Sequence, residues 1–333
     1  MRVVVLGHTE GWLRGSWSEL LNHPNTCIWN TKYPINNHKV LSFLARIHFS
    51  KKANSIIRLP FKNLWYKMFA ENISVNTGEE LLLIVYDNCR LGTNKEFLDY
   101  LRKRFKHIRM IYVMTNEVRF TYAFKNGFVD FLNDFYDQVY AFHKSDYEKY
   151  GFKVIPLIYS RYEIEHGEKK HCVFFAGGAK DRLEKLLEIH DHIRELGVDT
   201  DFYIIRSDTQ VDRKGITWNR ILSYEEVIRK TQECSVIIEV PQGILEAFTI
   251  KVCEAIFYDK LLITTNKMIL EAPFYDDRWM LYIEKPEDIT KEFLDRWKSV
   301  HYEKKARDYF SMNTFLRMAC NDVGINPPEW IDD

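Results

Sequence analysis

Two glutamates in the second half of the chain, Glu246 and Glu254, are separated by seven residues. An apolar stretch precedes them, and the helix expected from Thr249 onward carries the second. A loop and the helix that it opens can present both carboxylates on one side, where they could accept hydrogen bonds from sugar and ribose hydroxyls. The amides of residues 247–249 would form a helix N-terminus, which attracts phosphate, and Lys251 would add positive charge.

A glycine-rich, basic loop is a second candidate for binding phosphate. Gly177 and Gly178 follow the apolar stretch Cys172–Ala176, and Lys180 and Arg182 come directly after them. Paired glycines let backbone amides approach an anion closely, while the two basic side chains suit a diphosphate. Neither GxxxxGK[ST] nor GxGxxG is present, and a Gly-Gly pair by itself is often only a turn.

Positioning these loops requires a scaffold, and the hydrophobic pattern predicts two doubly wound α/β domains that face a cleft. Short apolar runs alternate with amphipathic stretches, as in βα units around a parallel sheet. Strands are expected at Arg2–Leu6, Leu81–Tyr86, Arg109–Met114, Gln138–Phe142, Cys172–Ala176, Asp201–Ile205, Ser235–Glu239, Leu261–Thr264 and Met280–Ile283. Helices are expected at Asn94–Phe105, Tyr122–Asn133, Asp181–Leu196, Tyr224–Gln232, Thr249–Tyr258, Pro286–Trp297 and His301–Cys320.

The length of 333 residues fits two domains, and a polar segment at Tyr159–Lys170 separates the two sets of strands. We therefore expect a first domain at 1–158 and a second domain at 159–300. The segment 301–333 would form a helix that folds back towards the first domain, followed by an irregular tail. Open α/β sheets bind ligands at the carboxyl ends of their strands, so the candidate loops lie where chemistry is expected.

Charge is spread unevenly along a chain whose net charge is zero. Residues 1–70 carry ten Lys or Arg and two Asp or Glu, and residues 31–70 contain no acidic residue. Aromatic and aliphatic residues interleave with the basic ones, which suits an anionic membrane surface or a phosphorylated acceptor. The alternative is a solvated helical face over a core. The near-neutral pI of about 7.2 and the lack of a reader motif argue against a nucleic-acid partner.

The six cysteines are far apart and form no CxxC pair, which indicates reduced thiols. The apolar run at the start is too short for a signal peptide, and no stretch approaches the length of a membrane span. We expect a cytoplasmic protein that could also dock on the inner face of a membrane. Motifs of serine hydrolases, zinc proteases, EF-hands and protein kinases are absent.

The segment Glu246-Ala247-Phe248-Thr249-Ile250, with Glu254-Ala255, resembles the E-G-F-G-L-x-x-x-E-A signature of retaining GT-B glycosyltransferases. It also resembles a T-[LI]-R-x-x-E-A pattern of bacterial enzymes that assemble lipopolysaccharide, O-antigen and capsule. The stretches 140–159 and 174–187 fit the same group, so the resemblance covers about residues 135–300. Ala247 and Thr249 stand where the signature often has glycines, and Lys251 replaces an arginine, which leaves the sugar and the phosphate contacts open.

This resemblance implies a hexosyltransferase that uses a nucleotide-sugar donor and a glycan or lipid-linked acceptor. Glu254 would hold the ribose, Glu246 would contact the donor sugar, and Thr217–Glu225 would lie beside the nucleobase. The implied donor-binding residues are Gly177, Gly178, Lys180, Arg182, Tyr224, Ala247, Phe248, Thr249, Lys251 and Glu254. No metal or other cofactor is expected, because helix amides and basic side chains would stabilise the leaving group. The D-x-D at Asp199–Asp201 precedes its strand and is interpreted as a turn.

Catalytic candidates besides Glu246 follow strands of the first domain. They are His8, Glu10 and Asp87, with Glu117 as a further option. An inverting enzyme would need one of them as general base, whereas a retaining enzyme could use the donor phosphate. Two alternatives remain, namely a non-catalytic subunit that binds a sugar nucleotide or glycan, and another GT-B enzyme such as a UDP-sugar epimerase.

Overall fold

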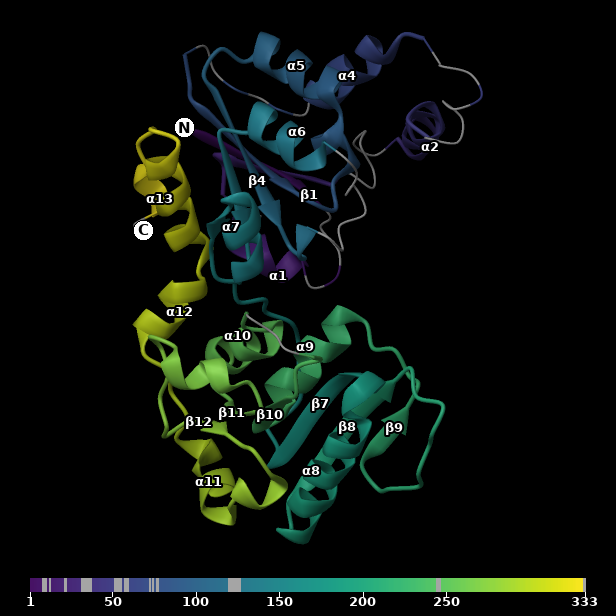
Figure 1. Cartoon of the computed structure of the whole chain (residues 1–333), viewed down its shortest axis with the longest axis vertical. Coiled ribbons are helices and arrows are strands. Elements are labelled where there is room, and N and C mark those ends of the chain that lie inside the picture. Colours follow the sequence, from purple (N-terminus) through teal and green to yellow (C-terminus); the bar gives the residue numbers. More distant parts are fainter. Residues whose placement is uncertain are drawn as a thin grey trace. The chain divides into compact units, whose positions relative to one another are not determined.

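The structure, a computed structural model, describes residues 1–331 except 8–10, 12, 21–22, 31–37, 51–55, 57–59, 72, 74, 76–77, 119–126 and 244–246. The chain divides into two compact units. The first comprises Met1–Ile155 and Phe315–Asp333, and the second comprises Pro156–Thr314. Each unit is built on a six-stranded parallel sheet with helices beside it (Figure 1). The division between the units lies after Ile155, three residues before the boundary expected after residue 158.

The first unit has the strand order β2-β1-β3-β4-β5-β6. Its strands are β1 (Arg2–Gly7), β2 (Thr26–Asn30), β3 (Leu81–Tyr86), β4 (Ile108–Met114), β5 (Gln138–Ala141) and β6 (Lys153–Val154). Its helices include α1 (Leu13–Trp17), α2 (Lys39–His48), α4 (Lys62–Ala70), α5 (Lys95–Arg104), α6 (Phe128–Phe135) and α7 (Lys144–Tyr150). All six residues of β3 are buried, because a central parallel strand is covered on both faces.

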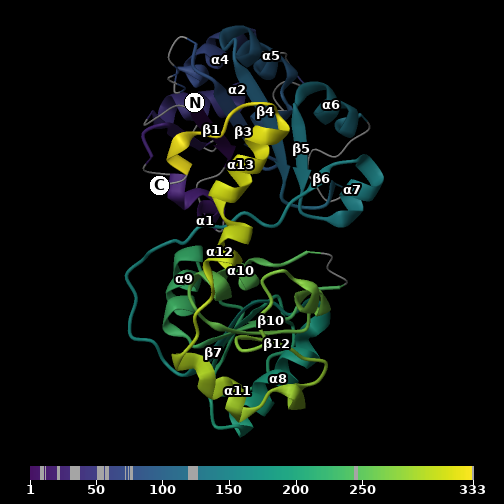
Figure 2. The same cartoon turned by 90° about the vertical axis from the view of Figure 1, so that its left-hand side faces the viewer.

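The C-terminal helix α13 (Met312–Asp322) joins the first unit from Phe315 onward. Asp322 accepts hydrogen bonds from Tyr140 Oη and Lys153 Nζ, both at 2.7 Å, and Arg109 Nε donates to the carbonyl of Val323 at 3.0 Å. Figure 2 shows α13 beside the strands that carry these residues. The end of the chain is therefore held by β4, β5 and β6.

The second unit has the strand order β12-β11-β10-β7-β8-β9. Its strands are β7 (Cys172–Gly178), β8 (Asp199–Ile205), β9 (Ile216–Trp218), β10 (Val236–Glu239), β11 (Leu261–Thr264) and β12 (Met280–Tyr282). Its helices include α8 (Leu183–Glu195), α9 (Tyr224–Glu233), α10 (Ile250–Phe257), α11 (Lys291–Asp295) and α12 (Lys304–Phe310). The chain builds the sheet outward from β7 to β9 and then resumes on the other side with β10. The winding direction thus reverses between β7 and β10.

The α/β prediction is confirmed, and the nine expected strands are present with ends shifted by no more than two residues. Strands β2, β6 and β9 were not predicted, because they are short and their burial is mixed. The D-x-D prediction was wrong, since Asp199 begins β8 itself. There Asp199 pairs with Arg194 and Asp201 pairs with Lys230, at the amino end of the strand.

Two long helices expected near the end of the chain are interrupted. Ser311 has an extended backbone and its hydroxyl accepts a hydrogen bond from the amide of Thr314, so His301–Cys320 splits into α12 and α13. Thr290 caps α11 in the same way, so Pro286–Trp297 is α11 flanked by short 3-10 turns. Hydroxyl residues compete with the helix for backbone amides, which explains both breaks. The helix expected at Tyr122–Asn133 begins at Phe128 in the described part.

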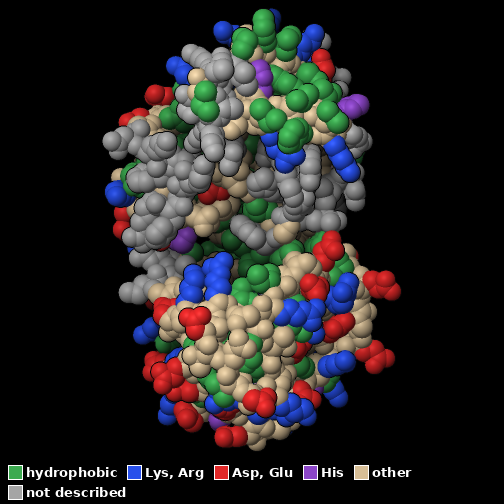
Figure 3. All heavy atoms as spheres, turned by 90° about the vertical axis from the view of Figure 1, so that its right-hand side faces the viewer, with side chains coloured by type: hydrophobic (Ala, Val, Ile, Leu, Met, Phe, Trp, Pro, Cys, Tyr) green, Lys and Arg blue, Asp and Glu red, His purple; other side chains and the backbone are tan. Residues whose placement is uncertain are grey.

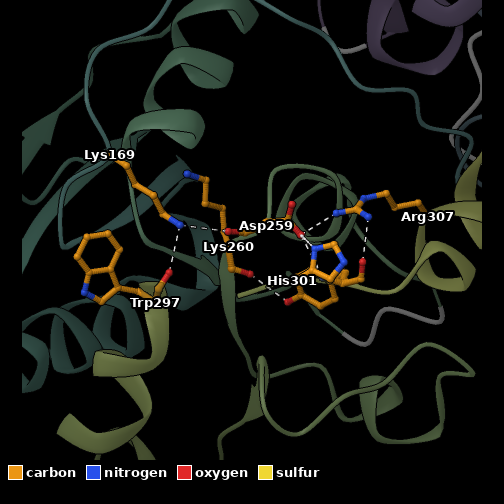
Figure 4. Close-up of polar contacts among 7 residues, drawn as sticks. Lys169, Asp259, Lys260, Trp297, His301 and Arg307 are labelled. Carbon is orange, nitrogen blue, oxygen red and sulfur yellow. Dashed lines mark hydrogen bonds and ion pairs between the residues drawn. The ribbon is translucent and has the colours of Figure 1, made fainter. Parts of the chain in front are cut away.

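The turn between α10 and β11 anchors the last part of the second unit (Figure 4). Asp259 accepts hydrogen bonds from Arg307 at 2.7 Å and from the amide of Tyr302 at 3.0 Å. Next to it, Lys260 is 3% exposed, and its ammonium donates to the carbonyls of Gln232 and Cys234 at the C-terminal end of α9. Burial lowers the pKa of Lys260 to about 8.

The buried Lys260 should make stability rise with alkaline pH. An unfolded lysine has a pKa of about 10.4, so between about pH 8 and about pH 10.4 the unfolded chain binds more protons than the folded chain. Relative to a Lys260→Met variant, the free energy of unfolding of the wild type should increase by about 1–2 kcal/mol from pH 7 to pH 9.5. Urea unfolding of both proteins across this range measures the difference. A difference independent of pH would contradict the assignment.

Candidate functional site

The two candidate loops of the second unit meet at the point where its winding direction reverses. They follow β7 and β10, which are neighbours in the sheet. Three hydrogen bonds join them. Lys180 Nζ donates to Gln242 Oε1, Arg182 donates to the carbonyl of Val240, and the amide of Gly243 donates to Asp181 at 3.3 Å. In open α/β sheets this reversal point, at the carboxyl ends of the strands, is where ligands bind.

Arg182 holds the glycine loop from within. Its Nε donates to the carbonyl of Gly178 at 2.9 Å, and its guanidinium lies 5.2 Å from the centre of the Phe175 ring. A methyl group on Gly177 would come within 2.7 Å of Arg182 Nη2 and 3.0 Å of the Phe175 ring. A side chain at position 177 would therefore force the end of Arg182 or the Phe175 ring to shift. Lys180, by contrast, is exposed beside the loop.

The N-terminus of α10 is fixed by a buried carboxylate that the sequence analysis did not select. Glu239, at the end of β10, is 2% exposed. It accepts hydrogen bonds from the hydroxyl and the amide of Thr249 and from the hydroxyl of Thr264. Burial raises the pKa of Glu239, and these donors oppose the shift. Thr249 also caps α10 by accepting from the amide of Lys251 at 3.2 Å.

Glu254 lies one turn inside α10 and is 1% exposed. Its carboxylate pairs with Lys251 Nζ at 2.7 Å, and the same ammonium lies 5.4 Å from the centre of the Phe174 ring. Two residues expected to contact different parts of a donor are therefore each other's partners. A buried carboxylate with a single cationic partner is sensitive to anything that competes for that cation.

The remaining donor candidates line the same edge of the sheet. The carbonyl of Ala247 accepts from Asn266 at 3.2 Å, and the Phe248 ring packs edge-on against Phe274 at 5.1 Å. Tyr224 begins α9, where Ser223 and Glu226 form a capping box. The Tyr224 hydroxyl lies 3.1 Å from that of Tyr159.

In the first unit, Asp87 lies at the corresponding reversal point, after β3 and next to β1. It accepts hydrogen bonds from the amide of Thr115 at 3.0 Å and from its hydroxyl at 2.7 Å. Burial raises the pKa of the Asp87 carboxyl. These hydrogen bonds join the loop after β3 to the loop after β4. The other catalytic candidates, His8, Glu10 and Glu246, lie outside the described residues.

Glu239 and Gln242 are the site residues that sequence reasoning missed. A glutamate that ends an otherwise apolar strand is an available signal, because a fully buried carboxylate is rare unless it is paired. Gln242 carried no such signal, since an exposed loop glutamine is ordinary. Within the described part of the chain, no three His, Cys, Asp or Glu side chains come together so as to hold a metal ion. None of the described helices is long and apolar enough to cross a bilayer.

Removing the Glu239 carboxylate should loosen the start of α10. In Glu239→Ala, Thr249 and Thr264 lose a buried acceptor, which should lower the free energy of unfolding by about 1–3 kcal/mol. Hydrogen exchange at the amides of residues 249–252 should accelerate. Glu239→Gln keeps one acceptor oxygen and should lie between the alanine variant and the wild type. Unchanged exchange in the alanine variant would show that Glu239 does not hold this helix end.

Adjacent glycines provide a matched test of the close approach at Arg182. Gly177→Ala should lower stability by about 1–3 kcal/mol, because the new methyl group displaces the guanidinium or the Phe175 ring. In Gly178→Ala the atom nearest to the new methyl group is Gln242 Nε2 at 3.6 Å, so stability should stay within about 0.5 kcal/mol of the wild type. Thermal and urea unfolding compare the two. Equal losses of stability in the two variants would mean that the contact with Arg182 is not the reason for a glycine at position 177.

No protein-family model matches the chain, and no curated protein matches it either. Solved structures do match. One, an alpha-glucosyltransferase in complex with UDP-glucose and DNA containing an abasic site, aligns over 97% of this chain and 99% of that chain, with 10% identity and a TM-score of 0.55. Another, an alpha-glucosyltransferase in complex with UDP, aligns over the same shares with 8% identity and a TM-score of 0.53. With its two parallel six-stranded α/β units, the chain has the fold of the GT-B glycosyltransferases.

Proposed function

We propose that this protein transfers a sugar from a nucleotide-sugar donor to a glycan or lipid-linked acceptor in bacterial surface polysaccharide synthesis. The observation that carries the proposal is the joining of the Gly177–Arg182 loop to the segment before α10, at the reversal point of a Rossmann-ordered sheet. The GT-B fold supports it, because the aligned alpha-glucosyltransferases bind UDP-glucose or UDP.

The expected chemistry follows from the charges at this edge. The bond between the anomeric carbon and the diphosphate breaks, and the acceptor oxygen bonds to that carbon. The nucleoside diphosphate leaves with an added negative charge, which the exposed Lys180 and the N-terminus of α10 would stabilise. We propose that no metal takes part. Glu254 would accept hydrogen bonds from ribose, while Lys251 turns from it towards the diphosphate.

Retention of the anomeric configuration is part of the proposal. In that case an oxygen of the leaving phosphate takes the proton of the acceptor hydroxyl, and Glu246 contacts the donor sugar. Asp87 would orient the acceptor, together with His8 and Glu10. Inversion would instead require one general base, for which the candidates are His8, Glu10, Asp87 and Glu117. The configuration of the product, measured by NMR, distinguishes the two routes.

The acceptors to be tested include a class that the sequence did not suggest. One of the aligned alpha-glucosyltransferases binds DNA, which runs against the expectation of no nucleic-acid partner. DNA therefore belongs in the panel of acceptors to be tested, beside glycans and lipid-linked sugars. A cytoplasmic location with peripheral contact to the membrane completes the proposal.

Donor binding is tested by thermal unfolding with a panel of nucleotide sugars. At a concentration of about ten times Kd, a bound donor adds about 1.4 kcal/mol to the free energy of unfolding. Each added kcal/mol raises Tm by about 2–4 °C. Glu254→Gln should abolish the shift, because an amide accepts fewer hydrogen bonds from ribose. Asp201→Asn is the matched control. It breaks the Lys230 ion pair of 2.7 Å in the same unit and should retain the shift.

The outcomes separate the candidate functions. No shift with any UDP-, GDP-, ADP-, CMP- or dTDP-sugar would remove the donor site. A shift without transfer to any acceptor would favour a non-catalytic binding subunit. Conversion of the free donor sugar into its epimer would favour an epimerase. Transfer that survives Glu254→Gln would place the ribose contact elsewhere.

A further inference from the structure

Helix α2 presents four of its large apolar residues to solvent. Val40, Phe43, Leu44 and Ile47 follow the spacing i, i+3, i+4, i+7, which normally forms the buried stripe of a helix. Here they are 72%, 55%, 45% and 43% exposed. A stripe of this length in a folded protein is costly to leave in water, so it indicates a surface that something else covers.

The opposite face of α2 explains how the helix is held. Ser42 and Ala45 are each 1% exposed, and Leu41 packs against the core of the first unit, so α2 is held through this face. Its end contacts α4, where the His48 and Trp65 rings lie 5.7 Å apart. The packing therefore uses the face that a sequence pattern would have assigned to solvent.

The start of α4 adds to the exposed apolar surface. Phe61 is 74% exposed and Leu64 is 63% exposed, while Tyr66 and Phe69 of the same helix are buried. Figure 3 shows apolar side chains gathered in the upper part of one face, with Lys and Arg side chains beside them. We call the six exposed residues the apolar face. They are Val40, Phe43, Leu44, Ile47, Phe61 and Leu64.

The basic residues near the apolar face indicate which kind of partner it would bind. Lys39 and Arg46 flank the stripe on α2, and Lys67 is exposed on α4. The stretch 31–70 contains eight basic residues and no acidic residue. Apolar side chains with cations beside them match a bilayer surface with anionic headgroups, because the apolar side chains can enter the acyl boundary and the cations can bind lipid phosphates.

We propose that the apolar face docks on an anionic lipid bilayer, with α2 lying in the interface plane. This names the surface that would make the contact, and it goes beyond the sugar-transfer proposal because it involves no donor residue. Phe43 and Leu44 would enter the headgroup boundary, and Lys39 and Arg46 would meet lipid phosphates. Docking of this kind weakens as salt screens the charges.

Vesicle co-sedimentation of the full chain tests the proposal. Vesicles of phosphatidylcholine with about one-third phosphatidylglycerol should bind the wild type, and pure phosphatidylcholine vesicles should bind it at least about tenfold more weakly. Phe43→Ser with Leu44→Ser should reduce binding by about tenfold or more. The matched control is Ile221→Ser, because Ile221 is 77% exposed in the second unit and should be replaceable without loss.

Charge variants test the second component of the surface. Lys39→Glu with Arg46→Glu should abolish the preference for anionic vesicles, whereas Lys103→Glu, on the exposed side of α5, should preserve it. Unchanged binding by the serine variant would overturn the proposal. So would a serine variant that converts a dimer to a monomer in light scattering, since a second copy would then cover the face. An unaltered Tm of each variant shows that the fold persists, and an unaltered donor-induced shift separates this result from the sugar-transfer proposal.

Discussion

A carboxylate buried inside a protein is costly unless hydrogen-bond donors surround it. The second unit contains a buried carboxylate that has such donors. Glu239 ends β10 in the interior and draws Thr249 and Thr264 to itself. The first contact fixes where α10 begins, and the second ties that point to β11. Because desolvation of a charge is costly, the loss of either contact would leave the buried carboxylate less well compensated. Hydrogen bonds to Glu239 therefore attach the start of α10 to the edge of the sheet.

Most of the cationic side chains at this edge of the sheet make contacts within the protein. Arg182 and Lys251 were expected to face a diphosphate, yet each is engaged internally, with loop carbonyls in one case and with Glu254 in the other. Lys180 is the cation that the loop leaves exposed. An arriving anion would thus meet Lys180 first and compete for Lys251. The buried pairing keeps Glu254 in place without a ligand.

The two units have the same sheet topology but differ in the surfaces that they expose. Each reverses its winding direction once, and a carboxylate lies at that point in both, Asp87 in the first and Glu239 in the second. The first unit differs in carrying α2, whose apolar stripe faces outward. Its basic, acid-free segment suits an acceptor that is itself at a membrane. Asp87 and the apolar face would then act on one acceptor, which remains part of the proposal.

The sequence by itself determined the α/β class and nine of the described strands, because buried strands such as β3 and β11 are almost entirely apolar runs whose burial depends little on their neighbours. It also selected the loops after β7 and β10, since glycine and charge after a strand are local signals. Tertiary structure alone decided which partners those residues take. The pairing of Lys251 with Glu254, the role of Glu239 and the outward turn of α2 depend on contacts and exposure that arise only once the chain has folded. A hydrophobic period shows that a helix has two faces, but which face meets the core is fixed by the space that the neighbouring elements leave.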